Sequence, residues 1–311
     1  MRITHGFHPL KQPHAVTIGN FDGLHMGHQA MLARLQHVAQ ERGLPSCVLS
    51  FEPHPREFFS PQNAPARLSS LREKAGWLDQ LGIARLHVFR FNRAFAALTA
   101  SEFIQRILVD TLHARYVLVG DDFRYGAKRT GDFALLVKNG PAAGFDAEAL
   151  STVQIDGERA SSTAVRTALA AGDLAHAARL LGRPYSICGR VMHGDKLGRE
   201  LGYPTANVQI QHNHPPLSGI FAVTVSNING RELPGVASLG VRPTMKAAGA
   251  APVLEVHLFD FDTELYGRRV RVNFLHKLRD EAKFPDLPSL IAQIGRDVDN
   301  AKQFLKQQHH G

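Results

Sequence analysis

The first half of this 311-residue chain alternates strand-like and helix-like segments, and this alternation constrains the fold more than any other feature. Apolar runs at 15–19, 46–51, 86–91 and 116–120 have the length of buried strands, and segments with helical periodicity separate them. Strands that alternate with helices predict a parallel, doubly wound α/β sheet of the Rossmann-like kind. Ligands of such sheets bind at the edge where the strands end.

The pattern changes near residue 183, where short β-rich runs broken by turn residues replace the helical segments. The six runs are 186–193, 205–210, 219–226, 232–240, 253–259 and 269–276. Helical periodicity returns only over 290–305. Six short strands and a closing helix predict a small six-stranded antiparallel β-barrel with a C-terminal helix. We therefore expect two domains, 1–182 and 183–311.

The net charge of +8 invites comparison with nucleic-acid-binding proteins, but the basic residues are spread evenly. There are 20 Lys and Arg against 16 Asp and Glu up to Gly182, and 16 against 12 after it. No apolar run reaches the length of a membrane span, and the N-terminus lacks the apolar core of a secretory signal. Cys47 and Cys188 lie far apart within strand-like runs, as buried cysteines in a reducing compartment do. We expect a cytoplasmic protein.

The stretch VTIGNFDGLHMGHQAML at 16–32 places a glycine-rich turn between a strand and a helix. Backbone N–H groups at a helix N-terminus bind phosphate, and glycines let the backbone approach a ligand closely. His25 and His28 add side-chain donors beside that turn, so the stretch favours a phosphate site. Two alternatives stay open: a metal-binding His-x-x-His pair, and two surface histidines without a role.

Three further segments follow predicted strands or open a predicted helix. They are FEPHP at 51–55, GDDFRYGAKRTGD at 120–132 and SSTAVR at 161–166. Taken alone, a serine at the start of the last segment is typical of a helix cap, and Arg166 of a solvated helix charge. Their common place along one edge of the predicted sheet favours a shared site instead.

These segments, with GNFDGLHMGH first, resemble in content and order the FMN adenylyltransferase domain of bacterial bifunctional riboflavin kinase/FAD synthetases, nucleotidyltransferases with an HxGH signature. The resemblance implies that the FMN phosphate attacks the α-phosphorus of MgATP and expels pyrophosphate, without a protein nucleophile. It implies catalytic roles for His25, His28 and Arg166. It implies ATP contacts for Gly19, Asn20, Phe21, Asp22, Gly23, Gly27, Ser162 and Thr163. It implies flavin contacts for Asp122, Phe123, Arg124 and Gly126.

The stretch HGDKLGRELGYPTANV at 193–208 is the most specific motif of the second half. Its glycines would expose backbone to a ligand, and Thr205 and Asn207, two apart on a strand, project to one side. A hydroxyl and an amide oxygen are ligands that suit Mg²⁺ bridging phosphates. From composition alone, an ordinary glycine-rich turn followed by a strand is the alternative.

This stretch resembles the nucleotide loop and PTAN motif of riboflavin kinases, and GIFAV, ASLGVRPT, LEVHLFDFDTELYG and LRDEAKF follow in family order. Spacing alone makes Glu255 a solvent-facing residue, whereas the resemblance implies the base that takes the riboflavin 5′-hydroxyl proton. It implies ATP contacts for Gly194, Gly198, Gly202 and Thr205, and Mg²⁺ contacts for Thr205 and Asn207. It implies flavin contacts for Arg279, Glu281 and Phe284. The small residues at 245–252 suggest a mobile lid without an assigned role.

We therefore predict an enzyme that converts riboflavin to FMN and FMN to FAD, using ATP with Mg²⁺ and releasing ADP and pyrophosphate. We expect no nucleic-acid, membrane or obligate protein partner. One rival is a nucleotidyltransferase for another acceptor with a regulatory barrel; an intact GYPTAN and Glu255 disfavour it. A second is a basic RNA-binding protein, disfavoured by the even charge distribution and by the lack of clustered aromatics in the barrel motifs.

Overall fold

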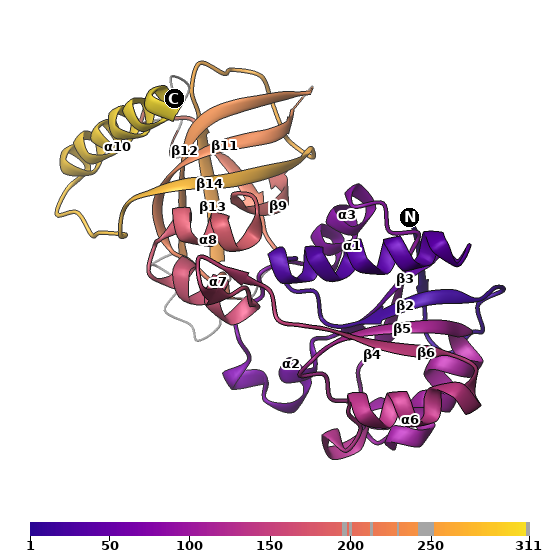
Figure 1. Ribbon diagram of the computed structural model, residues 1–311. Helices are drawn as coiled ribbons and strands as arrows, with labels where there is room; N and C mark the ends of the chain where they lie inside the picture. The colour runs from indigo at the N-terminus through magenta and orange to yellow at the C-terminus, as the bar shows by residue number, and fades with distance from the viewer. Residues whose placement is uncertain (195–197, 199–200, 212–213, 229, 242–251, 309–311) are drawn as a thin grey trace. The chain divides into compact units, whose positions relative to one another are not determined.

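The computed structural model describes residues 1–194, 198, 201–211, 214–228, 230–241 and 252–308. Contacts divide the chain into two compact units, which Figure 1 draws in indigo to magenta and in rose to yellow. The first comprises Met1–Pro65 and Leu71–Ser161, and the second Ala66–Ser70 and Ser162–Gly311. All but Pro252 of the expected lid at 245–252 falls outside the described residues.

The first unit contains a six-stranded sheet in the order β1-β4-β3-β2-β5-β6, and its neighbouring strands are parallel. The strands are β1 Arg2–His5, β2 His14–Ile18, β3 Ser46–Glu52, β4 Arg85–Arg90, β5 Ala114–Gly120 and β6 Asp146–Leu150. The predicted parallel sheet is confirmed, and the four strands predicted from apolar runs occupy its centre. A short antiparallel hairpin lies outside the sheet, β7 Gln154–Ile155 with β8 Glu158–Arg159.

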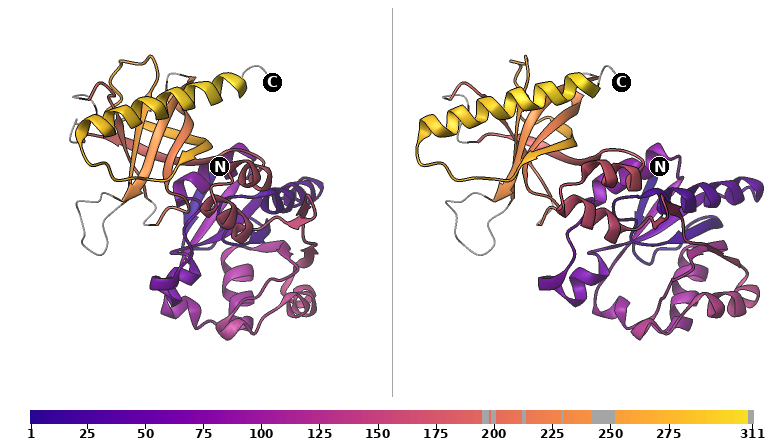
Figure 2. Two further views of the ribbon diagram at one scale, coloured as in Figure 1. Left: turned by 90° about the vertical axis from the view of Figure 1, so that its left-hand side faces the viewer. Right: turned by 60° about the vertical axis from the view of Figure 1, so that its left-hand side comes forward.

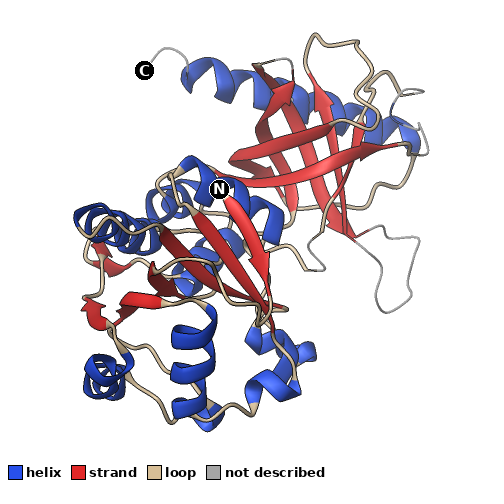
Figure 3. Ribbon diagram, turned by 90° about the vertical axis from the view of Figure 1, so that its right-hand side faces the viewer, coloured by secondary structure: helices blue, strands red, loops and turns tan. Residues whose placement is uncertain are grey.

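Helices cover both faces of this sheet (Figure 3). They are α1 Met26–Glu41, α2 Pro55–Phe59, η1 Pro61–Asn63, α3 Leu71–Gln80, α4 Arg93–Ala96, α5 Ala100–Glu102, η2 Phe103–Thr111, η3 Ala127–Arg129 and α6 Phe133–Ala143. Alternate residues of β2 serve the two faces: Ala15 packs with Leu35 of α1, whereas Val16 packs with Ile107 of η2. The sheet is therefore doubly wound, as predicted.

The second unit is built around a closed barrel in the strand order β10-β13-β12-β11-β14-β9, antiparallel throughout. Its elements are α7 Ser162–Ala170, α8 Leu174–Leu181, β9 Tyr185–Met192, β10 Ala206–Gln209, β11 Gly219–Ile228, β12 Arg231–Val241, β13 Pro252–Leu258, β14 Arg269–Arg279 and α10 Leu287–Gln308. The predicted six-stranded barrel with a C-terminal helix is confirmed.

Helix α10 lies along the outside of the barrel, as both views of Figure 2 show. Its apolar side, with Val298, Ala301 and Leu305, is buried in a cluster with Ala222 of β11 and Val236 of β12. The helix is thus packed onto the barrel through a buried apolar cluster and is an integral part of the second unit.

The compact units divide the chain at Ser162, whereas the sequence predicts a boundary at 182/183. The difference consists of α7 and α8, which pack on each other, while α8 also packs on β9 and β14. A boundary read from composition falls where β-rich runs begin, and these two helices lie before that point. The boundary between functional domains stays a prediction.

Candidate active sites

The turn between β2 and α1 carries the GNFDG sequence, and its backbone is held in an unusual conformation. Phe21, Gly23 and Leu24 have φ of 48°, 79° and 44°, and both Phe21 and Leu24 are fully buried. Left-handed backbone at non-glycine residues persists only where the surrounding packing holds it, and such residues gather at functional sites. The buried rings and side chains therefore fix this turn before any ligand arrives.

The two histidines of the motif lie together at the start of α1. His25 directly precedes the helix, and its ring stacks on that of His28 with centroids 3.7 Å apart. The first turn of α1 holds no acidic residue, so nothing on that turn offsets the positive end of the helix dipole. A Cβ atom at Gly27 would lie 3.2 Å from the His25 ring, so a glycine at this position leaves room for the His25 ring beside His28.

A buried lysine lies beside this pair. Lys74 of α3 donates from Nζ to Ser50 Oγ at 3.2 Å, and Ser50 Oγ donates to the Asn20 carbonyl at 3.4 Å. The pKa of His28 lies well below its ordinary value, because burial disfavours the charged ring and the His25 and Lys74 charges add repulsion. His28 is therefore a neutral imidazole at pH 7.

Two buried polar atoms of this cluster have no hydrogen-bond partner among the described residues, His28 Nδ1 and Asn20 Oδ1. Buried polar atoms in native structures are usually paired, so such atoms mark where a ligand or ion binds. Sequence reasoning named both residues but missed Lys74 and Ser50. Only their places connect them to the sheet edge, because Ser50 lies near the end of β3 and Lys74 in the first turn of α3.

Two charged residues of the loop after β5 form ion pairs within the protein, and two of its aromatic rings stack on each other. Asp122 forms an ion pair with Arg159 at 2.7 Å, and Arg124 one with Asp132 at 2.8 Å. The rings of Phe123 and Tyr125 stack 5.6 Å apart. The predicted flavin contacts Asp122 and Arg124 are thus engaged within the protein, while Phe123 remains a flat apolar surface.

This surface continues into a cluster of phenylalanines that the sequence motifs did not identify. Ring contacts connect Tyr125 to Phe103, Phe103 to Phe95, and Phe95 to Phe51 and Phe91. From Phe91 the contacts reach Phe58 and Phe59 of α2. Phe59 is 67% exposed, so the outer end of the cluster is open to a planar ligand.

Gly126, in the loop after β5, has φ of 72° and packs closely against α5. A Cβ atom there would lie 2.8 Å from the Ala100 nitrogen.

The predicted triphosphate contacts Ser162, Thr163 and Arg166 lie in the first half of α7, in the second compact unit. Arg166 donates from Nε to the Ala66 carbonyl at 2.6 Å. Because His25 and His28 belong to the other unit, the approach of these residues to the histidines stays a prediction.

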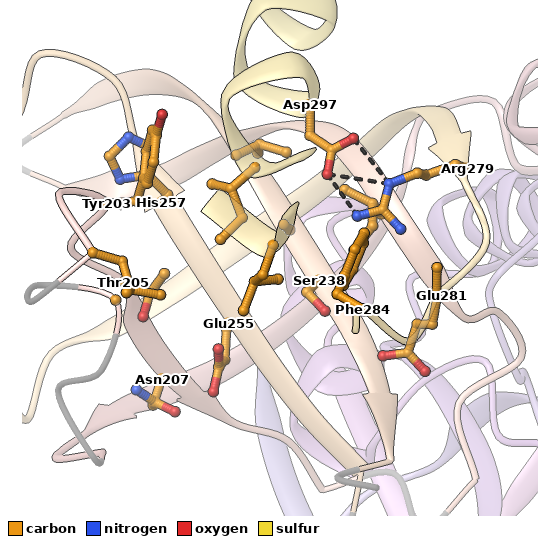
Figure 4. A pocket seen from close by; sticks show the side chains of 18 residues that line it. Tyr203, Thr205, Asn207, Ser238, Glu255, His257, Arg279, Glu281, Phe284 and Asp297 are labelled. Atoms are coloured by element: carbon orange, nitrogen blue, oxygen red, sulfur yellow. Dashed lines mark hydrogen bonds and ion pairs between the residues drawn. The ribbon is translucent and has the colours of Figure 1, made fainter. Parts of the chain in front are cut away.

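The second unit contains a pocket of about 440 Å³ on the barrel (Figure 4). Residues predicted from the sequence gather in its lining: Gly198, Thr205, Asn207, Glu255, Arg279, Glu281 and Phe284. Further lining residues were missed, among them Tyr203, Ser238, His257 and Asp297. No motif contains Asp297, which is why it was missed. Tyr203, Ser238 and His257 lie within the quoted motifs, but sequence reasoning assigned them no chemical role.

Three neighbouring strands place Asn207, Glu255 and Ser238 in one row. Asn207 of β10 is paired with Glu255 of β13, and Glu255 is paired with Ser238 of β12. Figure 4 shows the Asn207 and Glu255 side chains on the same side of the barrel wall. Side chains at paired positions lie about 5 Å apart, so the carboxylate has polar groups on both sides. Glu255 is half-buried and lines the pocket, not the solvent face that spacing alone suggested.

Glycines near the row of Asn207, Glu255 and Ser238 stand where a larger side chain would collide with pocket residues. A Cβ atom at Gly194 would collide with the Asn207 side chain, and one at Gly240 would collide with the Glu281 carboxylate. Gly202 has φ of 84°, which L-residues rarely adopt, and it precedes the Pro204–Thr205 turn into β10. The predicted nucleotide-loop glycines therefore have steric reasons to be glycine.

The far wall of the pocket is formed by Arg279, Phe284 and Asp297. The Arg279 guanidinium lies over the Phe284 ring, 5.7 Å from its centroid, and forms a two-pronged ion pair with Asp297. Partial burial raises the pKa of Glu281, although the nearby Arg279 charge opposes that change. This wall is planar, partly aromatic and close to charge-balanced.

A second pocket of about 320 Å³ adjoins the first and shares Thr205 with it. Its other lining residues include Val191 and the DTELY stretch at 262–266. The Tyr266 ring stacks on His193 at 3.8 Å, just before the glycine-rich loop. Two pockets that share a lining residue can hold two substrates of a group transfer.

Two family models match the chain: FAD synthetase over residues 8–164 and riboflavin kinase over residues 181–305. A bifunctional riboflavin kinase/FMN adenylyltransferase of Pseudomonas fluorescens is 50% identical over 313 residues, covering 100% of each chain. The protein of the same name from Escherichia coli K12 is 48% identical over 309 residues, covering 98% of each chain.

A solved structure also resembles the chain along nearly its whole length. It is that of a Streptococcus pneumoniae protein named a macrolide-efflux protein, with a TM-score of 0.81 at 28% identity. The match covers 95% of this chain and 97% of that one. Among the described residues here, no helix combines the length and apolarity that a membrane crossing needs.

Proposed function

Because the chain belongs to the bifunctional riboflavin kinase/FMN adenylyltransferase family, we propose that the barrel carries one of the two reactions and the edge of the parallel α/β sheet carries the other. The barrel unit phosphorylates riboflavin with ATP, giving FMN and ADP. The α/β unit supplies the histidine pair that stabilises the phosphates while the FMN phosphate takes the adenylyl group directly from ATP, giving FAD and pyrophosphate. The observation that carries the proposal is the meeting of two pockets at Thr205, beside the half-buried Glu255.

In the barrel, riboflavin occupies the larger pocket and the nucleotide the smaller one. The Glu255 carboxylate accepts the proton of the riboflavin 5′-hydroxyl as that oxygen attacks the γ-phosphorus. The bond from the γ-phosphorus to the bridging oxygen breaks, and ADP leaves. Support comes from the pairing of Glu255 with Asn207 and Ser238, which surrounds the carboxylate with polar groups.

The donor set near the shared wall fits a magnesium ion that arrives with ATP. Among the described residues, no group of three or more His, Cys, Asp or Glu side chains could hold a metal by itself. Mg²⁺ is commonly held by few protein oxygens together with phosphates and water, and Thr205 and Asn207 supply such oxygens. When bound, the ion neutralises charge on the transferred phosphoryl group.

In the α/β unit, the FMN phosphate oxygen attacks the α-phosphorus of ATP, and the bond to the β-phosphate oxygen breaks. His25 and a neutral His28 donate hydrogen bonds to the phosphates, and the start of α1 adds its dipole. Phe123 and the phenylalanine cluster that ends at Phe59 support the flavin ring. Ser162, Thr163 and Arg166 belong to the second compact unit, and their contact with the triphosphate stays a prediction from the sequence.

A time course tests both assignments. The purified protein is incubated with riboflavin and MgATP, and riboflavin, FMN and FAD are separated by chromatography. FMN should appear before FAD. FMN alone would confine the proposal to the barrel and favour a different acceptor for the α/β unit, and no flavin product would overturn the proposal.

Two variants separate the sites within one chain. Glu255→Gln should slow FMN formation by about 100-fold or more, the usual contribution of a catalytic base, and leave adenylylation of added FMN intact. His28→Ala should do the reverse. Loss of both activities in either folded variant would contradict the assignment of one site to each unit.

We also propose that the protein acts in the cytoplasm, as expected from the sequence. The Cys47 thiol is fully buried, and burial raises its pKa to about 12. Such a thiol behaves as a small apolar core residue, in keeping with a reducing compartment.

A further inference from the structure

Asp297 is a buried carboxylate outside every recognised motif, and it lines the barrel pocket from α10. Its side chain is 6% exposed. Its oxygens accept three hydrogen bonds from Arg279: Nε donates to Oδ1 at 2.9 Å and to Oδ2 at 3.2 Å, and Nη2 donates to Oδ2 at 2.7 Å. Gln293, one turn earlier on the same helix, donates to Oδ1 at 2.8 Å. The carboxylate is therefore held on both sides, as the dashed lines in Figure 4 indicate for the arginine.

This geometry fixes the plane of the Arg279 guanidinium. A two-pronged pair constrains orientation as well as distance, which a single hydrogen bond does not. The remaining nitrogen, Nη1, donates to the Asp280 carbonyl at 2.9 Å. Every nitrogen of the group is thus engaged at its edge, and the flat face is left for stacking, with Phe284 below it at 5.7 Å.

The same pair also balances the charge of the wall. A guanidinium without its carboxylate would be a partly buried cation beside the raised-pKa carboxyl of Glu281. With Asp297 in place, α10 presents an apolar wall of Leu290 and Ile294 next to a neutralised, planar arginine. Such a wall suits an uncharged planar heteroaromatic ring.

We propose that Asp297 is a positioning residue for riboflavin binding, which sets the plane and charge of Arg279 so that the isoalloxazine ring packs against it. This inference rests on the proposed function of the barrel. Asp297 acts through Arg279 and takes no part in proton or phosphoryl transfer. Its loss should therefore change riboflavin affinity far more than the rate at saturating riboflavin.

The test compares full-length variants in steady-state phosphorylation of riboflavin. In Asp297→Asn an amide N–H₂ faces the arginine donors and the fork is lost. We expect the KM for riboflavin to rise about tenfold or more, equivalent to about 1.4 kcal/mol, with kcat within about threefold of wild type. The matched control is Asp299→Asn, which removes an exposed carboxylate from the same helix and should change neither constant.

Arg279→Lys provides a second route to the same answer, because lysine keeps the charge but lacks the planar fork. It should reproduce the KM effect even if Asp297→Asn unfolds the barrel. Titration of riboflavin fluorescence with MgADP present measures binding without turnover. The α/β unit is unaltered in all variants, so differences between them arise in the barrel.

The outcomes separate the two proposals. If wild type neither binds nor phosphorylates riboflavin, the proposed function fails and the inference fails with it. If wild type is active and a folded Asp297→Asn keeps the wild-type KM, only the role of Asp297 is refuted, whatever Arg279→Lys does; if Asp297→Asn does not fold, a wild-type KM in Arg279→Lys refutes it. A fall in kcat at unchanged KM, in a barrel that melts as wild type does, would also refute it, since it would assign these residues to the chemical step.

Discussion

Lys74 illustrates, at the scale of single residues, how a site depends on side chains outside its motifs. Its ammonium group is buried, donates to Ser50, and repels the charged form of His28. A buried lysine beside a phosphate-binding turn stabilises anionic ligands. It also holds the nearby imidazole neutral, and a neutral imidazole can both donate and accept a hydrogen bond.

Replacing Lys74 by Met should raise the pKa of His28, because one source of repulsion disappears while burial continues to depress it. Titration of ring-labelled histidines by NMR, with His28→Gln to assign the resonance, measures this directly. The acid limb of FAD formation should move to higher pH, and riboflavin phosphorylation should not change. Lys138→Met, at an exposed position of α6, is the control. An unmoved His28 resonance would show that Lys74 has no electrostatic role there.

Residue-level prediction succeeded where a motif concentrates unusual residue types. Asn207 of β10 is paired with Glu255 of β13, and Thr205, directly before β10, lines the same pocket. Their roles stay predictions. Lys74 and Asp297 could not be identified in this way, since an isolated lysine or aspartate on a helix is usually a solvated charge. Only tertiary packing buries these two.

At the scale of secondary structure, the helices and strands that the sequence predicted best are those with a continuous apolar run. The predicted strand at 46–51 is β3, Ser46–Glu52, and the helical periodicity predicted over 290–305 falls within α10, Leu287–Gln308. The edge strands β1 and β6 were missed. β1 is largely exposed and β6 reads DAEAL, so neither has the apolar pattern of a central strand.

Strand β12 supplies a test of how closely backbone geometry shapes the barrel pocket. A methyl group at position 240 would occupy the place of the Glu281 carboxylate, which must then move. Gly240→Ala should therefore raise the KM for riboflavin on the order of fivefold, or about 1 kcal/mol. The melting temperature should not fall, because alanine is no worse than glycine within a strand.

A double variant decides whether Glu281 carries that effect. If displacement of Glu281 is the cause, Gly240→Ala should add nothing to Glu281→Ala, and the two changes will not be additive. Full additivity of the two KM effects would instead mean that the methyl group disturbs the pocket by another route.

At the scale of the whole molecule, two buried histidines distinguish the first compact unit in its expected response to acid. His14 and His87 are both fully buried in the first unit, and burial lowers the pKa of each to about 4. His14 accepts from Arg85 Nε, and His87 contacts Thr4 Oγ1 and the Gly6 carbonyl. Both rings are neutral at pH 7 and are integral to the sheet.

These two histidines should make the first unit acid-sensitive. Their pKa in the unfolded chain is about 6.5, so the unfolded state takes up protons first as the pH falls. The contribution of each histidine to the free energy of unfolding is complete above pH 6.5 and is lost between pH 6.5 and about 4. This contribution is on the order of 3 kcal/mol for each histidine. FAD formation should consequently be lost by unfolding at a pH where riboflavin phosphorylation persists.

One tryptophan makes this measurable without separating the units. Trp77, the single tryptophan of the chain, lies in α3, so its fluorescence follows the first unit alone. The urea concentration at the midpoint of unfolding, followed by Trp77 fluorescence, should fall steadily from pH 6.5 to 4.5. The control variant His8→Gln, at an exposed position, should show the same dependence of the midpoint on pH. A midpoint independent of pH would mean that the buried histidines are protonated at no cost, contrary to their burial in the sheet.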